Sequence, residues 1–202
     1  MDAIVEATAR LLVERGYEGA TTRRVADRAG VSVGSLYQYF PSRDALVTAV
    51  IERHVGEVLE RIGGELRRLE TAPLDRAIRQ LVDTILELHD DDPGLHVILM
   101  EQLPRADRTA LLAKIERALG AHFRAFFRGR PDRPRFDVDR AMTVLARACI
   151  PIIHLHEARA GGPSDRRAED LFLIIFGYVR AATERGADTD GRGTRTSTLR
   201  HE

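Results

Sequence analysis

Residues 21–46 read TTRRVADRAGVSVGSLYQYFPSRDAL and hold the most specific structural signal in the chain. The stretch predicts two short helices, at about 22–29 and 33–40, separated by the turn Gly30-Val31-Ser32. Pro41 ends the second helix, because proline cannot continue a helical hydrogen-bond pattern. Two short helices around a glycine-containing turn form a helix-turn-helix arrangement.

Within this stretch, small apolar side chains are spaced so that one helix can cross closely over the next. Those expected to pack are Val25, Ala26, Ala29, Val31, Leu36 and Phe40. Ser32 is a natural N-cap for the second short helix. Val33 and Ser35 are therefore expected at its exposed N-terminal end, where an inserted recognition helix meets base edges.

The rest of this helix offers polar groups that suit DNA. Gln38 can bond an adenine edge through both groups of its amide, whereas the hydroxyls of Tyr37 and Tyr39 more often reach phosphate oxygens. A helix-turn-helix look-alike can also be a structural corner with no DNA role. Two exposed tyrosines beside the packing residues Leu36 and Phe40 argue against that interpretation.

On both sides of this stretch, apolar residues recur with the period of amphipathic helices. The first helix should stop at Gly16-Tyr17, and a fourth, capped by Ser42, should run to Gly63-Gly64 or a little beyond. Further helices are predicted at about 74–89, 94–103, 108–127, 138–160 and 165–185. No convincing strand appears, so the sequence predicts an all-α fold with about nine helices.

These elements suggest three parts. Residues 1–46 form the predicted helix-turn-helix domain, and residues 47–185 a larger helical domain for regulation. Residues 186–202 are rich in Gly, Thr and Arg and have Leu199 as their only large apolar residue, which predicts a disordered tail.

From about Ala3 to Ile51 the sequence resembles the TetR family of tetracycline-repressor-like transcriptional regulators. The family's Gly-aromatic end of the first helix is met by Gly16-Tyr17, and its opening threonines by Thr21-Thr22. Its turn is matched by Ala29 to Ser32, and its recognition-helix signature by Ser35 to Phe40.

The resemblance implies contacts with both the backbone and the bases of DNA. The expected phosphate contacts are Thr22, Tyr37, Tyr39 and Arg43, and the expected base contacts are Val33, Ser35 and Gln38. Arg43 stands where the family usually has a lysine, and either cation can pair with phosphate.

For the larger domain the resemblance implies a small-molecule cavity and a homodimer made by the last two long helices. A mostly apolar pocket could be lined by His96, Met100, Phe123, Phe127 and His154, although ordinary core packing explains these residues equally well. The expected dimer face consists of Leu145, Cys149, Ile152, Leu171, Ile174, Ile175 and Tyr178.

Composition sets the remaining limits. The 202 residues include 31 basic and 31 acidic side chains, yet residues 21–43 alone carry four arginines against Asp27. The presumed DNA face is therefore positive although the whole chain is neutral. Cys149 is the only cysteine, which excludes an internal disulfide framework. No apolar stretch is long enough to span a membrane, which predicts a cytoplasmic protein.

The histidines raise a metal hypothesis, since His89 precedes three aspartates and His154 and His156 lie two apart. Residues two apart do not share a helix face, and the aspartate run is typical of a solvated loop. We therefore predict no metal and no cofactor. No nucleophile elbow, phosphate-binding glycine loop or Glu-x-x-His ligand set is present, which argues against an enzyme.

Taken together, these patterns predict a ligand-responsive repressor. It would bind a near-palindromic DNA operator as a homodimer and release it when a small molecule binds. The alternatives are an activator of the same fold, or a helical enzyme that uses histidine and aspartate groups in the larger domain.

Overall fold

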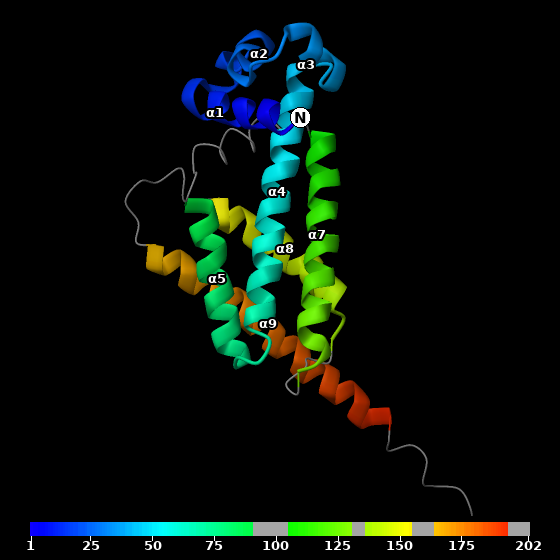
Figure 1. Ribbon diagram of the computed structural model, residues 1–202. Coiled ribbons are helices and arrows are strands. Elements are labelled where there is room, and N and C mark those ends of the chain that lie inside the picture. The colour runs from blue at the N-terminus through cyan, green and yellow to red at the C-terminus, as the bar shows by residue number, and fades with distance from the viewer. Residues whose placement is uncertain (91–104, 131–135, 155–163, 194–202) are drawn as a thin grey trace, which may run out of the picture. The chain divides into compact units, whose positions relative to one another are not determined.

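A computed structural model describes the backbone of residues 1–90, 105–130, 136–154 and 164–193, and the side chains of 1–89, 109–130, 136–153 and 166–185. Within these residues the chain forms eight helices and no strand (Figure 1). They are α1 (Asp2–Gly19), α2 (Thr22–Ala29), α3 (Val33–Tyr39), α4 (Arg43–Arg68), α5 (Leu74–Asp90), α7 (Arg105–Arg128), α8 (Val138–His154) and α9 (Ser164–Gly193).

The predicted all-α fold is confirmed. The helix expected at 94–103 lies outside the described residues, as does the expected end of α8 near residue 160. α9 continues to Gly193, beyond the predicted end at Arg185. Of the described helices, none is both long and apolar enough to cross a membrane.

The chain divides into two compact units. The first consists of Met1–Arg61 and Glu87–Ala113, and the second of Ile62–Leu86 and Lys114–Glu202. The division between them falls within three helices, α4, α5 and α7. The domain boundary expected after residue 46 follows the sequence motif rather than packing, and it stays a prediction.

Caps and glycines define the helix ends of the first unit. Gly16 has a φ of +66° and interrupts α1, so the predicted stop is a break followed by a short helical turn. Gly30, with a φ of +68°, adopts the left-handed conformation that ends α2. Ser32 Oγ accepts a hydrogen bond from the amide of Ser35 at 3.0 Å, and Ser42 Oγ accepts one from Ala45 at 3.1 Å. Both predicted serine caps are therefore present.

The core of the first unit combines the apolar faces of α1 to α4. Its most deeply buried large side chains are Leu12, Val25, Leu36, Leu46 and Val50. Thr8 is also buried, and its hydroxyl donates to the carbonyl of Ile4 at 2.7 Å. That bond satisfies a polar group in the core, as buried hydroxyls require.

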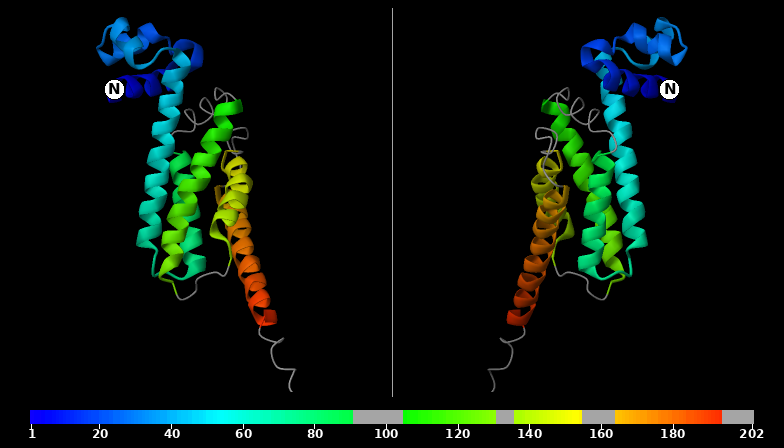
Figure 2. Two further views of the ribbon diagram at one scale, coloured as in Figure 1. Left: turned by 90° about the vertical axis from the view of Figure 1, so that its right-hand side faces the viewer. Right: turned by 90° about the vertical axis from the view of Figure 1, so that its left-hand side faces the viewer.

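The core of the second unit lies where α8 packs beside α9 (Figure 2). One cluster joins Val82 and Leu86 of α5 to Cys149 and Ile153 of α8 and to Leu171 of α9. Another is formed by Ala141, Met142 and Leu145 of α8. Edge-to-face aromatic contacts run beside it through Phe123, Phe126, Phe127, Phe136 and Tyr178.

The turn between α4 and α5 is held by a buried arginine. Arg130 donates from Nη1 to the carbonyl of Glu70 at 2.8 Å and from Nη2 to that of Ala72 at 2.6 Å. Its guanidinium lies 4.6 Å from the centre of the Phe126 ring. These bonds satisfy carbonyl groups beyond the C-terminal end of α4 and fix the turn that follows.

Candidate nucleic-acid interface

The outer face of α3 carries the predicted DNA-contacting side chains. Tyr37 and Tyr39 are 49% and 59% exposed, and Val33 and Gln38 are exposed beside them. Ser35 is half-buried, and its hydroxyl lies 2.8 Å from Ser32 Oγ. The short helix therefore presents a continuous polar and aromatic surface.

Two hydroxyls predicted to reach phosphate lie together although they come from different helices. Thr22 Oγ1 of α2 and the Tyr37 hydroxyl of α3 are 3.3 Å apart. Thr21, the residue before α2, accepts a bond from the amide of Arg24 at 3.4 Å and caps that helix. Paired hydroxyls at a helix start can donate to the same phosphate group of a DNA backbone.

Arg43, predicted as a phosphate contact, is bound to the end of α1. Its guanidinium stacks on the Tyr17 ring at 3.8 Å from the ring centre. Its Nη1 donates to the Tyr17 carbonyl and to Glu18 Oε2, each at 3.3 Å. The Tyr17 hydroxyl in turn donates to Asp44, and this bond is the main reason that the pKa of Tyr17 is raised.

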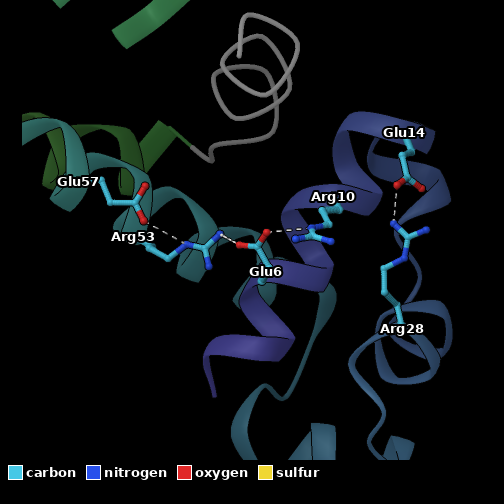
Figure 3. Close-up of polar contacts among 6 residues, drawn as sticks. All are labelled: Glu6, Arg10, Glu14, Arg28, Arg53 and Glu57. Carbon is cyan, nitrogen blue, oxygen red and sulfur yellow. Dashed lines mark hydrogen bonds and ion pairs between the residues drawn. The ribbon is translucent and has the colours of Figure 1, made fainter. Parts of the chain in front are cut away.

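Two of the three arginines of α2 are also engaged with α1. Arg28 Nη1 binds Glu14 Oε1 at 2.7 Å (Figure 3), and this bond lowers the pKa of Glu14. Arg24 Nη1 donates to the Gly19 carbonyl at 3.1 Å. Arg23 is exposed and, among the described side chains, has no hydrogen-bond or ion-pair partner. Sequence reasoning missed these contacts, since partners 14 and 25 residues apart are not implied by helical spacing.

A second charged network ties α1 to α4 (Figure 3). Glu6 accepts from Arg10 Nε at 2.9 Å and pairs with Arg53 Nη2 at 3.0 Å. Arg53 also lies 3.7 Å from Glu57. The bond from Arg10 is the largest cause of the lowered pKa of Glu6. α1 is thus connected to α4 through Glu6 in its first segment and through Tyr17 and Glu18 after the break at Gly16.

Family models match most of this chain. Residues 4–50 match the family described as bacterial regulatory proteins, tetR family, and residues 73–178 match the tetracyclin repressor-like C-terminal domain. The chain belongs to the TetR family. That family consists of bacterial regulatory proteins, so the prediction that the chain is not an enzyme is confirmed.

Similar curated proteins differ in their described roles. The nucleoid occlusion factor SlmA of Haemophilus influenzae is 36% identical over 102 residues, which cover 50% of this chain and 46% of SlmA. The transcriptional activator FasR of Mycolicibacterium smegmatis is 31% identical over 110 residues, or 54% and 49% of the two chains. The repressor KstR of Mycobacterium tuberculosis is 29% identical over 146 residues, or 69% and 64%. The match to this chain thus covers about half the length of SlmA and of FasR.

A solved TetR-family regulator from Streptomyces coelicolor has the same fold. It superposes with a TM-score of 0.68 at 23% identity, and the alignment covers 90% of this chain and 98% of that one. The agreement extends over the helices of both units, so the resemblance that the sequence showed most clearly before residue 51 holds for the fold as a whole.

In the C-terminal domain of this TetR-family chain, two of the five residues predicted to line a pocket have described side chains. Phe123 and Phe127 belong to the aromatic cluster of the second unit, with ring centres 6.2 Å apart. His96 and Met100 lie outside the described residues, and so does the side chain of His154. The described side chains contain no group of three or more His, Cys, Asp or Glu residues that could hold a metal ion.

The residues predicted to form the dimer face pack within their own protomer. Leu145, Cys149 and Leu171 are buried in the two clusters of the second unit. Packed against these clusters are the other four, Ile152, Ile174, Ile175 and Tyr178. Ile152, Ile174, Ile175 and Tyr178 are only half-buried, so the predicted dimer face stays a prediction.

α8 and α9 also carry a second, exposed set of apolar and small side chains. Val144 and Leu173 are 42% and 56% exposed. At helical spacing from them lie Ala148 and Pro151 on α8, and Gly177 and Ala181 on α9, all exposed. Sequence periodicity could not separate this surface from the inner one, because both faces of these helices are rich in apolar residues.

Proposed function

We propose that the protein is a DNA-binding transcriptional repressor of the cytoplasm, which binds a near-palindromic operator as a homodimer and releases it when a small molecule binds. The exposed outer face of α3, in a chain of the TetR family, carries this proposal. On that face Tyr37, Gln38 and Tyr39 point away from the buried Leu36.

The side chains divide into two roles. Val33, Ser35 and Gln38 read base edges from the helix that enters the major groove; Val33 and Gln38 are exposed there and Ser35 is half-buried. Thr22, Tyr37, Tyr39 and Arg43 contact phosphates and fix the register of the helix on the duplex. The 3.3 Å contact between Thr22 and Tyr37 supports a shared phosphate for those two.

The dimer forms through α8 and α9, the two helices that carry the predicted dimer face, and the exposed side chains of these helices extend that face. Val144, Ala148, Leu173 and Gly177 offer apolar area and small side chains that allow close helix packing. Two copies of this helix pair would build a four-helix interface with twofold symmetry. Such symmetry matches a near-palindromic operator.

Release requires two conformations. A ligand must bind better to the one whose recognition helices are wrongly spaced for successive major grooves, about 34–36 Å apart. α4, α5 and α7 each run across the division between the two compact units. Because α4 directly follows the recognition helix in the chain, it is the element that couples ligand binding to DNA release. Coupling energies of this kind are typically about 1–3 kcal/mol.

The relatives include both a repressor and an activator, so the sign of regulation requires an experiment. The repressor KstR aligns with 69% of this chain and the activator FasR with 54%. A reporter assay at the protein's own promoter, with and without the gene, separates the two. Higher reporter output without the gene supports repression, and lower output supports activation.

The division of roles on α3 is tested by two substitutions. Tyr37→Phe should weaken binding to specific and random duplexes alike, whereas Gln38→Ala should change the preference at one or two base pairs. Gln80→Ala, an exposed glutamine on α5, is the matched control and should change neither. Equal effects of Tyr37→Phe and Gln38→Ala on both kinds of duplex would refute the assignment.

A further inference from the structure

The C-terminal end of α1 binds three of the four arginines between residues 21 and 43. Arg24 bonds to the Gly19 carbonyl, Arg28 to Glu14, and Arg43 to Glu18 and the Tyr17 carbonyl. The positive charge that the sequence places on the DNA face is thus partly neutralised by the protein itself.

Arg43 is the arginine held most completely. Stacking on Tyr17 leaves its side chain 29% exposed, while the Glu18 side chain is 87% exposed. Asp44, the neighbouring carboxylate, is engaged by the Tyr17 hydroxyl. The negative group that pairs with the Arg43 guanidinium is therefore Glu18.

A carboxylate and a phosphate are alternative acceptors for one guanidinium, because both offer oxygen atoms with negative charge. If Arg43 contacts a DNA phosphate, that phosphate either displaces Glu18 or binds beside a like charge. Both cases lower the affinity for the DNA backbone. Since phosphate contacts carry no sequence information, they lower it for every sequence.

We propose that Glu18 competes with a DNA phosphate for Arg43 and so sets the strength of backbone binding. The proposal rests on the proposed function, since it requires that α3 docks on DNA with Arg43 near the backbone. It makes Glu18 a residue that limits affinity although it contacts no base.

The test compares Glu18→Gln with the wild type on a promoter duplex and on a random duplex, by fluorescence anisotropy from about 50 to 200 mM salt. We expect tighter binding to both duplexes by a similar factor, about 3- to 10-fold at the low-salt end. The plot of log K against log salt should steepen by up to about 1 per protomer, because Glu18 no longer offsets the positive charge that Arg43 offers to the phosphate.

Two variants separate this effect from a change in net charge. Glu169→Gln removes the same charge from a similar pair, in which Arg79 stacks on Phe172 at 3.9 Å and binds Glu169 at 3.0 Å. It should leave DNA binding unchanged. In an Arg43→Gln background, Glu18→Gln should lose most of its effect.

The competition is overturned if Glu18→Gln binds DNA no better than the wild type or Glu169→Gln, or if its gain persists without Arg43. A wild type that prefers no promoter sequence contradicts the proposed function instead. Even then, competition at Arg43 is supported if Glu18→Gln binds the random duplex more tightly than the wild type and this gain in affinity is lost in the Arg43→Gln background. A wild type that binds no duplex overturns both proposals.

Discussion

Cys149 lies in the core that α5, α8 and α9 form, and it is the only cysteine of the chain. Burial raises the pKa of its thiol from 9.0 to about 11. Because the thiolate is the reactive form, the folded protein should carry about 100-fold less of it at neutral pH than an exposed cysteine would.

We therefore expect a disulfide reagent to label the native protein at least about 100-fold more slowly than the urea-unfolded protein. Absorbance of the released thiol measures both rates, and the single cysteine makes the signal unambiguous. Equal rates in the two states would contradict the placement of Cys149 in the core.

The residues of α3 could be predicted from sequence, whereas their neighbours on α1 could not. α3 has seven residues, and burial of Leu36 fixes which side of this short helix faces the core. The exposure of Tyr37 and Gln38 then follows from helical geometry. The pair formed by Glu18 and Arg43 depends on how the end of α1 folds back on the start of α4, and no local pattern encodes this.

At the scale of single elements, two glycines of α4, Gly56 and Gly63, have different surroundings. The sequence predicted a helix that runs to Gly63-Gly64 or a little beyond, and α4 ends at Arg68. A Cβ at Gly63 would lie 2.5 Å from Cε1 of His122 on α7, so the glycine permits a close approach. Gly56 has no neighbouring atom within 4 Å of that position.

We expect Gly56→Ala to stabilise the protein by about 0.5–1 kcal/mol, because alanine restricts the unfolded chain and favours the helix. Gly63→Ala should be about 1–2 kcal/mol less stable than Gly56→Ala, since the His122 ring must move. Urea denaturation measures both. Identical shifts in the two variants would contradict the close packing of α4 on α7.

The network around Glu6 predicts how the α1–α4 contact responds to pH. The pKa of Glu6 is lowered from 4.5 in the folded protein, chiefly by Arg10. Its contribution is therefore fully present above the unfolded value and is lost as the pH falls through the folded one. The pairs are partly exposed, so we expect only about 0.5–1 kcal/mol.

Glu6→Gln should accordingly lower the free energy of unfolding by that amount near pH 7 and by much less near pH 3. Urea midpoints at both pH values give the comparison, with the wild type as reference. If Glu6→Gln lowers the free energy of unfolding equally at pH 7 and at pH 3, charge pairing is not the source of the stabilisation.

At the scale of the whole molecule, the all-α fold and the helix-turn-helix could be read from periodicity, caps and glycine breaks. The division of the apolar residues of α8 and α9 into buried and exposed sets could not be read in this way. α8 and α9 are apolar on two sides, and only packing shows that Leu145 and Leu171 face inward while Val144 and Leu173 face outward. Hydrophobic spacing alone does not distinguish a core face from an interface.

Leu173→Glu should convert the dimer to monomers, because it places a charge in an apolar interface. Sedimentation velocity measures the change. Val13→Glu on α1, where the parent residue is 46% exposed, is the control and should stay dimeric. A Leu173→Glu protein that remains dimeric, or a wild type that is monomeric at micromolar concentration, would contradict the proposed interface.

The central claim, a dimeric regulator that reads DNA sequence through α3, is tested most directly by measuring equilibrium binding to the protein's own promoter fragment and to a shuffled fragment at the same salt concentration. The account predicts that the promoter fragment is bound at least about 10³-fold more tightly, with one dimer per near-palindromic site. Equal, weak binding to the two fragments would contradict it.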